Sequence, residues 1–148
     1  MDTTTRDKIV SILGGANEMT LATVRPDGYP QATTVSYVYD GLTIYFGTAA
    51  NSQKARNIGL SDKVSLTVTL PYDRSEEILG LSMGARAALV TDPAEIARIG
   101  ELMLARFPQG ADFGPDESDA IALFSIKPVV VSVLDYRNGI GHTDLVEV

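Results

Sequence analysis

Two tight-turn sequences between strand-like segments constrain the fold of this chain more than any other feature. Arg25-Pro26-Asp27-Gly28 places Pro and Gly where a tight turn prefers them, between predicted strands over residues 18–25 and 30–39. Asp40-Gly41 is a second hairpin signal and leads into a predicted strand over 42–47. Strands joined by hairpins pair antiparallel, so these turns predict an antiparallel sheet.

Apolar periodicity predicts the remaining elements of what we expect to be one domain over residues 1–148. Residues 107–119 predict a loop with one helical turn near its end. Asp92 and Glu95 form a capping-box-like pair at the start of the third helix. The predicted helices cover residues 4–13 and 51–58 and a segment that begins at Asp92. The last of these carries Ile96, Ile99, Met103 and Phe107 on one face. The further predicted strands cover residues 64–70, 79–91, 122–127 and 129–136. This order is typical of a mainly β barrel with helices packed outside.

Composition excludes several kinds of site and partner. Twelve Lys and Arg against nineteen Asp and Glu give a net charge of −7, which argues against general nucleic-acid and membrane binding. The chain has no Cys, which excludes thiolate metal sites, and its single His142 excludes a multi-histidine metal site within one chain. Residues 1–7 are polar and carry no signal-peptide core, so we expect a cytoplasmic protein.

Residues 48–56, which we call the phosphate turn, are the most informative candidate site. They follow a predicted strand and open a predicted helix, whose first turn has free backbone N–H groups. Thr48 and Ser52 add hydroxyl groups, and Lys54 and Arg56 add positive charge, a set that suits a phosphate monoester. From the residues alone, a simple helix cap beside a solvated lysine is equally consistent.

Two further segments carry possible ligand contacts. Residues 31–37 hold many small polar side chains, which could meet the polar edge of a flat heterocycle or simply face solvent. Residues 135–142 place Tyr136, Arg137 and His142 beside two glycines. Their Gly spacing does not match a dinucleotide-binding loop, and a surface role for His142 is the simpler interpretation.

A series of short segments occurs in a fixed order over residues 4–142. They are Ala22-Thr23-Val24, Asp27-Gly28-Tyr29-Pro30, Val35-Ser36-Tyr37, Asp40-Gly41, Ile44-Tyr45-Phe46-Gly47-Thr48, Ser52-Gln53-Lys54, Asn57-Ile58, Val64-Ser65-Leu66, Gly84-Ala85-Arg86-Ala87 with Asp92-Pro93, and Pro128 with residues 131–136. Each segment is weak alone. Their order and spacing together resemble the pyridoxamine 5'-phosphate oxidase-like, FMN-binding split-barrel family.

This resemblance implies a six-stranded antiparallel split barrel that forms a homodimer, with two FMN molecules at the subunit interface. It also favours the interpretation of residues 48–56 as a phosphate site. Carried over position by position, the cofactor contacts are Thr33, Thr34, Val35, Ser36 and Tyr37 along the ring and ribityl chain, Thr48, Ser52, Gln53 and Lys54 at the phosphate, and, across the interface, Leu81 in the strand around residues 79–82 and Tyr136.

Several positions depart from the true oxidases that the family is named after. Gln53, Ala32 and His142 stand where those enzymes carry Arg, Tyr136 stands where they carry Trp, and a Gln near Leu79 is missing. The resemblance therefore implies a small flavin-dependent oxidoreductase with another small-molecule substrate. Tyr136 or His142 could position that substrate or donate a proton.

Two alternatives use the same fold. One is a deazaflavin-dependent reductase, whose cofactor phosphate would suit Lys54 and Arg56. The other is a non-catalytic flavin- or heme-binding protein, in which His142 offers the one imidazole available as an axial ligand.

Overall fold

The structure, a computed structural model, describes residues 1–109 and 120–148. Its helices are α1 (Thr3–Gly14), α2 (Gln53–Leu60) and α3 (Pro93–Arg106), and its 3-10 turns are η1 (Ser75–Glu77) and η3 (Tyr136–Asn138). Its strands are β1 (Glu18–Val24), β2 (Pro30–Ser36), β3 (Val38–Asp40), β4 (Thr43–Ala49), β5 (Lys63–Thr69), β6 (Leu79–Leu89), β7 (Ile121–Asp135) and β8 (Thr143–Glu147). None of the helices within the described residues is long and apolar enough to cross a membrane.

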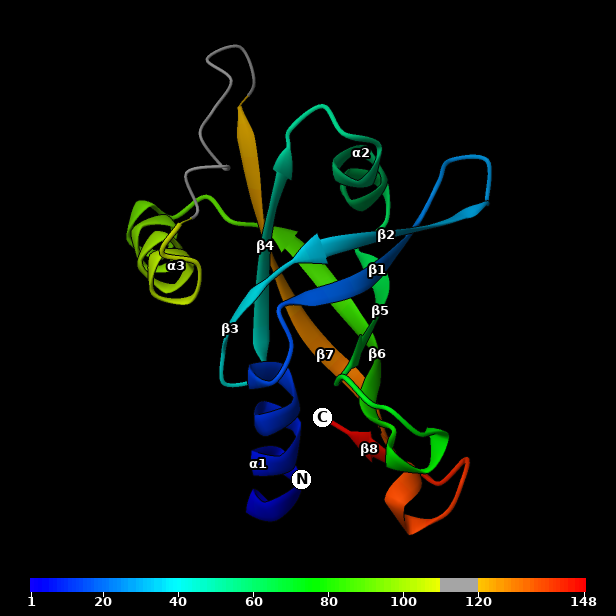
Figure 1. The fold of residues 1–148 in the computed structure, drawn as a ribbon. Coiled ribbons are helices and arrows are strands. Elements are labelled where there is room, and N and C mark those ends of the chain that lie inside the picture. The colour runs from blue at the N-terminus through cyan, green and yellow to red at the C-terminus, as the bar shows by residue number, and fades with distance from the viewer. Residues whose placement is uncertain (110–119) are drawn as a thin grey trace.

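The strands form one strongly curled antiparallel sheet with flanking helices (Figure 1), as the sequence predicts. The order is β2-β1-β5-β6-β7-β4-β3, and β8 pairs with β7. β2 and β3 stand at the two ends of this order but are consecutive in the chain, joined through Tyr37. The chain itself therefore closes the barrel at this seam, which is the split-barrel arrangement.

The sheet has eight strands where the resemblance implies six. The predicted strand over 30–39 forms two strands, because β2 pairs with β1 whereas β3 pairs with β4, and the buried Tyr37 lies where the partner changes. β8 was not predicted, because its five residues, mostly exposed, carry no clear alternation, although Asn138-Gly139 before it is a turn signal.

β7 runs unbroken through the position where the sequence predicts two strands separated by Pro128. It pairs with β6 along its length, with β4 over residues 121–126 and with β8 over residues 130–134. Its register with β6 shifts at Gly84/Ala85, so that Pro128 and Val130 pair with neighbouring residues of β6. The bulge tolerates the proline because the ladder is already interrupted there.

The core lies inside the curled sheet and follows the alternation of the strands. Met19 and Leu21 of β1, Leu66 of β5 and Met83 of β6 share the inner face, where all four are about 1% exposed. The alternate residues of the same strands, such as Thr20, Ser65 and Arg86, face outward.

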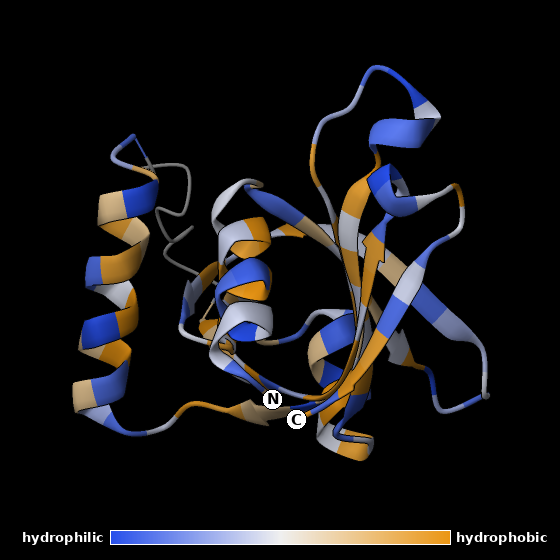
Figure 2. Cartoon of the chain, turned by 90° about the horizontal axis from the view of Figure 1, so that it is seen from below, coloured by the Kyte–Doolittle hydropathy of each residue, from blue (hydrophilic) through white to orange (hydrophobic). Residues whose placement is uncertain are grey.

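α1 lies across an open end of the curled sheet, and the two termini lie side by side near it (Figures 1 and 2). Ile9, Ile12 and Leu13 form its buried face. Asp2 caps the helix by accepting a hydrogen bond from the Thr5 N–H at 2.7 Å. The helix therefore completes the core at this end of the barrel.

α3 lies at the side of the barrel, next to β3 (Figure 2). Ile99 is buried, and Met103 and Phe107 pack around it, as their spacing predicts. Ile96, predicted on the same face, is 40% exposed, and the Asp92 side chain makes no capping hydrogen bond, so the predicted capping box does not form. The helix starts there because of Pro93 in its first turn. The helical turn predicted near the end of 107–119 lies outside the described residues.

Candidate functional site

The phosphate turn connects the end of β4 to the start of α2, as predicted. The Ser52 hydroxyl caps α2 by accepting a hydrogen bond from the Ala55 N–H at 3.2 Å, and it accepts another from the Thr48 hydroxyl at 3.0 Å. Because both of these bonds use Ser52 as an acceptor, its own hydroxyl proton is free to donate to an anion. The Thr48 proton is already used in this arrangement.

Lys54 supplies the positive charge of the turn. It lies in the first turn of α2, is half-buried, and has no hydrogen-bond or ion-pair partner within residues 1–109 and 120–148. Together with the Ser52 hydroxyl and the free N–H groups of the helix start, it forms a donor set that fits one phosphate group.

Gln53 and Arg56 have structural partners that sequence reasoning did not anticipate. Gln53 donates from Nε2 to Asn57 Oδ1 at 2.8 Å and accepts from Arg56 Nη2 at 3.0 Å, so both ends of its amide are engaged. Arg56 also donates to the Asn51 carbonyl at 2.7 Å. Arg56 thus braces the backbone of the turn, and Gln53 can offer a ligand its backbone N–H.

Asn57 anchors the turn to the barrel and was missed as a functional candidate. Its side chain is fully buried, and Nδ2 donates to Thr23 Oγ1 at 3.0 Å and to Gln31 Oε1 at 3.1 Å. Through Thr23 and Gln31 this amide connects α2 to β1 and β2, and its oxygen accepts the hydrogen bond from Gln53. The available signal was a polar residue between Ala55 and Ile58 on the inward face of an amphipathic helix.

The candidate contacts on β2 are divided between two faces of the sheet. Thr33 and Val35 pair with Leu21 and Met19 and face inward, whereas Thr34 and Ser36 share the outer face. A single ligand on one side cannot contact all four side chains. The register of an alternating strand makes this division unavoidable.

Tyr37 is a core residue. It is 1% exposed, and its hydroxyl donates to the Leu13 carbonyl at 2.6 Å, with the Ala16 carbonyl at 3.0 Å. Burial raises its pKa to about 12, although the nearby Arg106 charge opposes this. Leu81 is likewise 1% exposed, so the side chains of these two candidates are not open to a ligand.

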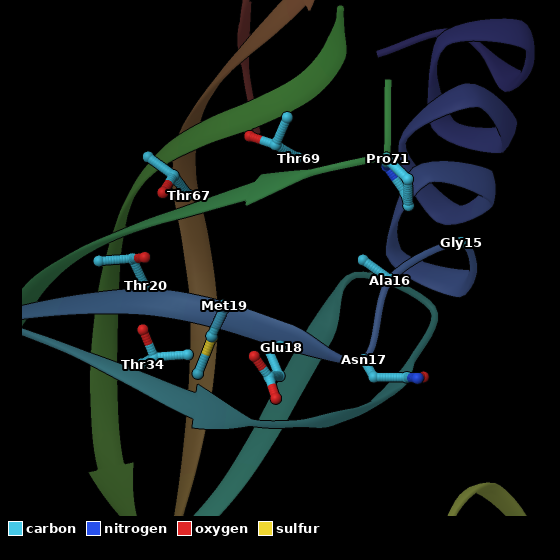
Figure 3. A pocket seen from close by; sticks show the side chains of 10 residues that line it. All are labelled: Gly15, Ala16, Asn17, Glu18, Met19, Thr20, Thr34, Thr67, Thr69 and Pro71. Carbon is cyan, nitrogen blue, oxygen red and sulfur yellow. The ribbon is translucent and has the colours of Figure 1, made fainter. Parts of the chain in front are cut away.

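A cavity of about 480 Å³ opens on the outer face of the sheet between α1 and the strands (Figure 3). Its hydroxyl groups come from β1, β2 and β5, and Glu18 adds a carboxylate. Of the predicted contacts it contains Thr34, and it includes no cation. The polar residues that line it are Asn17, Glu18, Thr20, Thr34, Thr67 and Thr69. This lining does not favour a phosphate, and the cavity is separate from the phosphate turn.

The 3-10 turn η3, which begins at Tyr136, and the segment to β8, which contains His142, lie at the far end of the molecule from α2, in orange to red at the bottom of Figure 1. Tyr136 and His142 are both half-buried. The His142 ring nitrogen Nε2 lies 3.2 Å from Asp144 Oδ2. The phosphate turn and the Tyr136 segment of one chain therefore do not meet.

Asp135 organises this far end. Its side chain is 3% exposed and accepts hydrogen bonds from Lys8 at 2.7 Å and from two nitrogens of Arg137 at 2.8 Å. The Arg137 hydrogen bonds, with those from Lys8, hold the pKa of this carboxyl well below its usual range despite burial. The segment that carries Tyr136 is thus fixed to both β7 and α1.

Comparison with known proteins identifies the family. The sequence matches the pyridoxamine 5'-phosphate oxidase family over residues 5–135. Comparison with curated protein sequences gives no match.

Solved structures share the fold. A heme binding protein from Mycobacterium smegmatis superposes with a TM-score of 0.82 at 19% identity, covering 99% of this chain and 59% of its own, so this chain spans little more than half of that protein. A conserved hypothetical protein from Mycobacterium tuberculosis has a TM-score of 0.78 at 26% identity, covering 97% and 91%. The heme storage protein from Vibrio cholerae has a TM-score of 0.69 at 21% identity, covering 82% and 88%. With most of its length matched by the family and its split-barrel fold shared with these structures, this chain belongs to the pyridoxamine 5'-phosphate oxidase family.

Proposed function

We propose that this protein binds FMN through the phosphate turn and acts as a small flavin-dependent oxidoreductase. The observation that carries the proposal is the donor set at the start of α2. Ser52 has a free hydroxyl proton, and Lys54 has no anionic partner among the described residues. The first N–H groups of α2 complete a site for a phosphate monoester.

In this proposal the chain's own residues hold and orient the cofactor. Lys54 and Ser52 bind the phosphate, and Arg56 and Asn57 keep the turn in place. Bound FMN would supply the hydride or electron transfer itself. The side chains on one face of β2, either Thr33 and Val35 or Thr34 and Ser36, then border the rest of the cofactor.

The site is completed by a second copy of the chain. The turn η3 and the segment to β8, which carry Tyr136 and His142, lie at the opposite end of the barrel from α2 in one protomer (Figure 1), so a site that uses both ends requires two chains. An isologous dimer would bring each end against the other and create two equivalent sites. Tyr136 and His142 are then placed to contact a small-molecule substrate.

The test is a titration of the purified protein with FMN, followed by absorbance and flavin fluorescence. We expect about one FMN per chain. Lys54→Ala removes one charge-assisted hydrogen bond, worth ~1.5–3 kcal/mol, and is expected to weaken binding by about 10- to 100-fold. Lys63→Ala, an exposed lysine at the start of β5, is the matched control and leaves the affinity unchanged. Equal affinity in the wild type and Lys54→Ala would remove the phosphate assignment.

Heme is the second candidate ligand, since two structures with the same fold are a heme binding and a heme storage protein. Asp144 beside Nε2 orients the His142 ring and leaves Nδ1 open. A Soret band after heme addition that disappears in His142→Ala would support this ligand. A yellow flavin spectrum unaffected by that variant would support FMN, and retention of deazaflavin with no affinity for FMN would support the deazaflavin alternative.

A further inference from the structure

Three cations stand in one row across the outer face of the sheet, away from the phosphate turn. Lys63 of β5 pairs directly with Arg86 of β6, and Arg86 pairs directly with Lys127 of β7. All three side chains are exposed. Because neighbouring strands lie ~4.8 Å apart, this cationic row extends over ~10 Å.

The cationic row is unexpected on energetic grounds. Like charges directly opposite one another on a sheet are destabilising, and the chain as a whole has a net charge of −7. Asp62 contacts Arg86, with its two oxygens 3.0 and 2.9 Å from Nη1. Lys63 and Lys127 have no ion-pair partner within residues 1–109 and 120–148. The contacts of the fold therefore do not explain why three positive charges are aligned here.

An open groove runs beside the cationic row. One part, of about 270 Å³, is lined by Arg86 with its partner Asp62, by Lys127 and by the apolar Val129. An adjoining part, of about 210 Å³, is lined by Lys63, Arg86 and Gly84. The two parts share Arg86 and Val129, and Val129 is 50% exposed. The groove thus combines positive charge on one side with an apolar floor.

We propose that the cationic row and its groove bind a small organic diphosphate. Two adjacent phosphate groups would each lie between two neighbouring cations, and the organic part would cover Val129. A single phosphate reaches fewer of the cations. Nucleic acids and lipid surfaces need an extended basic field, which the net charge of the chain does not provide.

The test uses the full-length protein with FMN added, so that the phosphate turn is not available to the probes. Inorganic pyrophosphate, ADP and inorganic phosphate are titrated at low ionic strength, followed by calorimetry and by the amide NMR signals of Gly84 and Val129. We expect ADP to bind most tightly and phosphate least tightly. Binding should weaken as salt is raised, because the cations are exposed.

Variants distinguish this site from the phosphate turn. Arg86→Ala is expected to weaken ADP binding by at least about tenfold, and Lys127→Gln by a smaller factor. Asp62→Asn releases Arg86 and is expected to strengthen binding, an effect that a purely structural role of the pair would not produce. Lys54→Ala, which impairs the proposed FMN site, and Arg74→Ala, an exposed arginine outside the row, leave ADP binding unchanged.

The proposal is independent of the proposed flavin function. It is overturned if none of the probes binds at millimolar concentration, as would happen if a second copy covered this face. It is also overturned if Arg86→Ala binds ADP as the wild type does, or if Lys54→Ala abolishes the binding. Thermal unfolding of each variant verifies that the fold is retained.

Discussion

At the scale of single residues, one buried amide determines where the phosphate turn sits. Asn57 makes hydrogen bonds to Thr23, Gln31 and Gln53, which belong to two strands and the helix itself. A buried polar group is costly unless its bonds are made. The residues that touch a ligand are therefore positioned by one that does not.

Asn57→Ala should lower the free energy of unfolding by about 2–3 kcal/mol, because it leaves buried partners without a hydrogen bond. Urea unfolding measures this change. Asn51→Ala is the control: its side chain is exposed, and the turn uses its backbone carbonyl. An exposed substitution of this kind is expected to stay within about 0.5 kcal/mol. Equal effects of the two variants would contradict the anchoring role of Asn57.

The Tyr37 hydroxyl gives a second prediction at this scale. Because burial raises its pKa to about 12, the folded protein keeps this phenol protonated where an ordinary tyrosine ionises. Stability should consequently fall as pH rises from about 10 to about 12, since the unfolded chain releases the proton first. Burial also raises the pKa of Tyr45, so absorbance titration should show late ionisation of which the Tyr37 step is missing in Tyr37→Phe. Tyr39→Phe, which removes a half-buried hydroxyl, should leave that late step intact.

At the scale of elements, α1 is held to the barrel by contacts at its middle and at its C-terminal end. Lys8 binds Asp135 at the end of β7, and Arg106 of α3 donates to the Leu13 carbonyl at 3.1 Å and to the Ala16 carbonyl. Arg106 also lies 5.1 Å above the Tyr37 ring. Helix α1 thus depends on partners that are more than ninety residues away in sequence.

Asp135→Asn should destabilise the protein by about 2 kcal/mol at neutral pH, because two charge-assisted contacts lose their acceptor charge. The pKa of Asp135 is depressed in the folded state. Its contribution is therefore present above an ordinary carboxyl pKa of about 4 and is lost as pH falls below that value. Urea unfolding at pH 6 and pH 3 measures this. The difference in stability between the variant and the wild type should be smaller at pH 3 than at pH 6, whereas Asp73→Asn, an exposed control, should differ from the wild type at neither pH.

Helices and strands followed from the sequence to the extent that local rules determine them. The hairpin turn at residues 25–28 forms as predicted, with Gly28 at a positive φ of 88° and its N–H bonded to the Arg25 carbonyl. Pro128 was misjudged because a bulge, which depends on the partner strand, accommodates it. The function of Gln53 as a brace was not predictable, because its partners are fixed only when the helix docks on the barrel.

At the scale of the whole molecule, the resemblance to a known family predicted the split barrel better than the periodicity did. Closure through Tyr37 joins the first and last strands of the sheet order, and no local pattern indicates it. The same resemblance implied which residues contact the cofactor, but not on which face of the sheet each side chain lies. Register then divided Thr33 from Thr34, and burial removed the side chains of Tyr37 and Leu81 from the surface.

A two-chain site can be tested by mixing variants. The pure Lys54→Ala and Tyr136→Ala proteins should each bind FMN poorly. Each should run as a dimer of about 31.6 kDa, twice the 15.8 kDa of one chain. After exchange of subunits, each mixed dimer would contain one site with both residues intact. FMN titration should then recover wild-type affinity at one site per mixed dimer. No recovery despite verified exchange would contradict a site shared between chains.

The length and position of β7 also bear on how the protein is made. Residues 44–49 of β4 pair with residues 121–126, so the ribosome must synthesise the whole intervening chain before this edge is covered. At ordinary rates of translation that takes on the order of several seconds. During this interval β4 presents an open strand edge with the apolar Ile44 and Phe46, the kind of surface that chaperones recognise. Newly made chains of this protein should therefore be most vulnerable to aggregation until residues 121–126 have been synthesised.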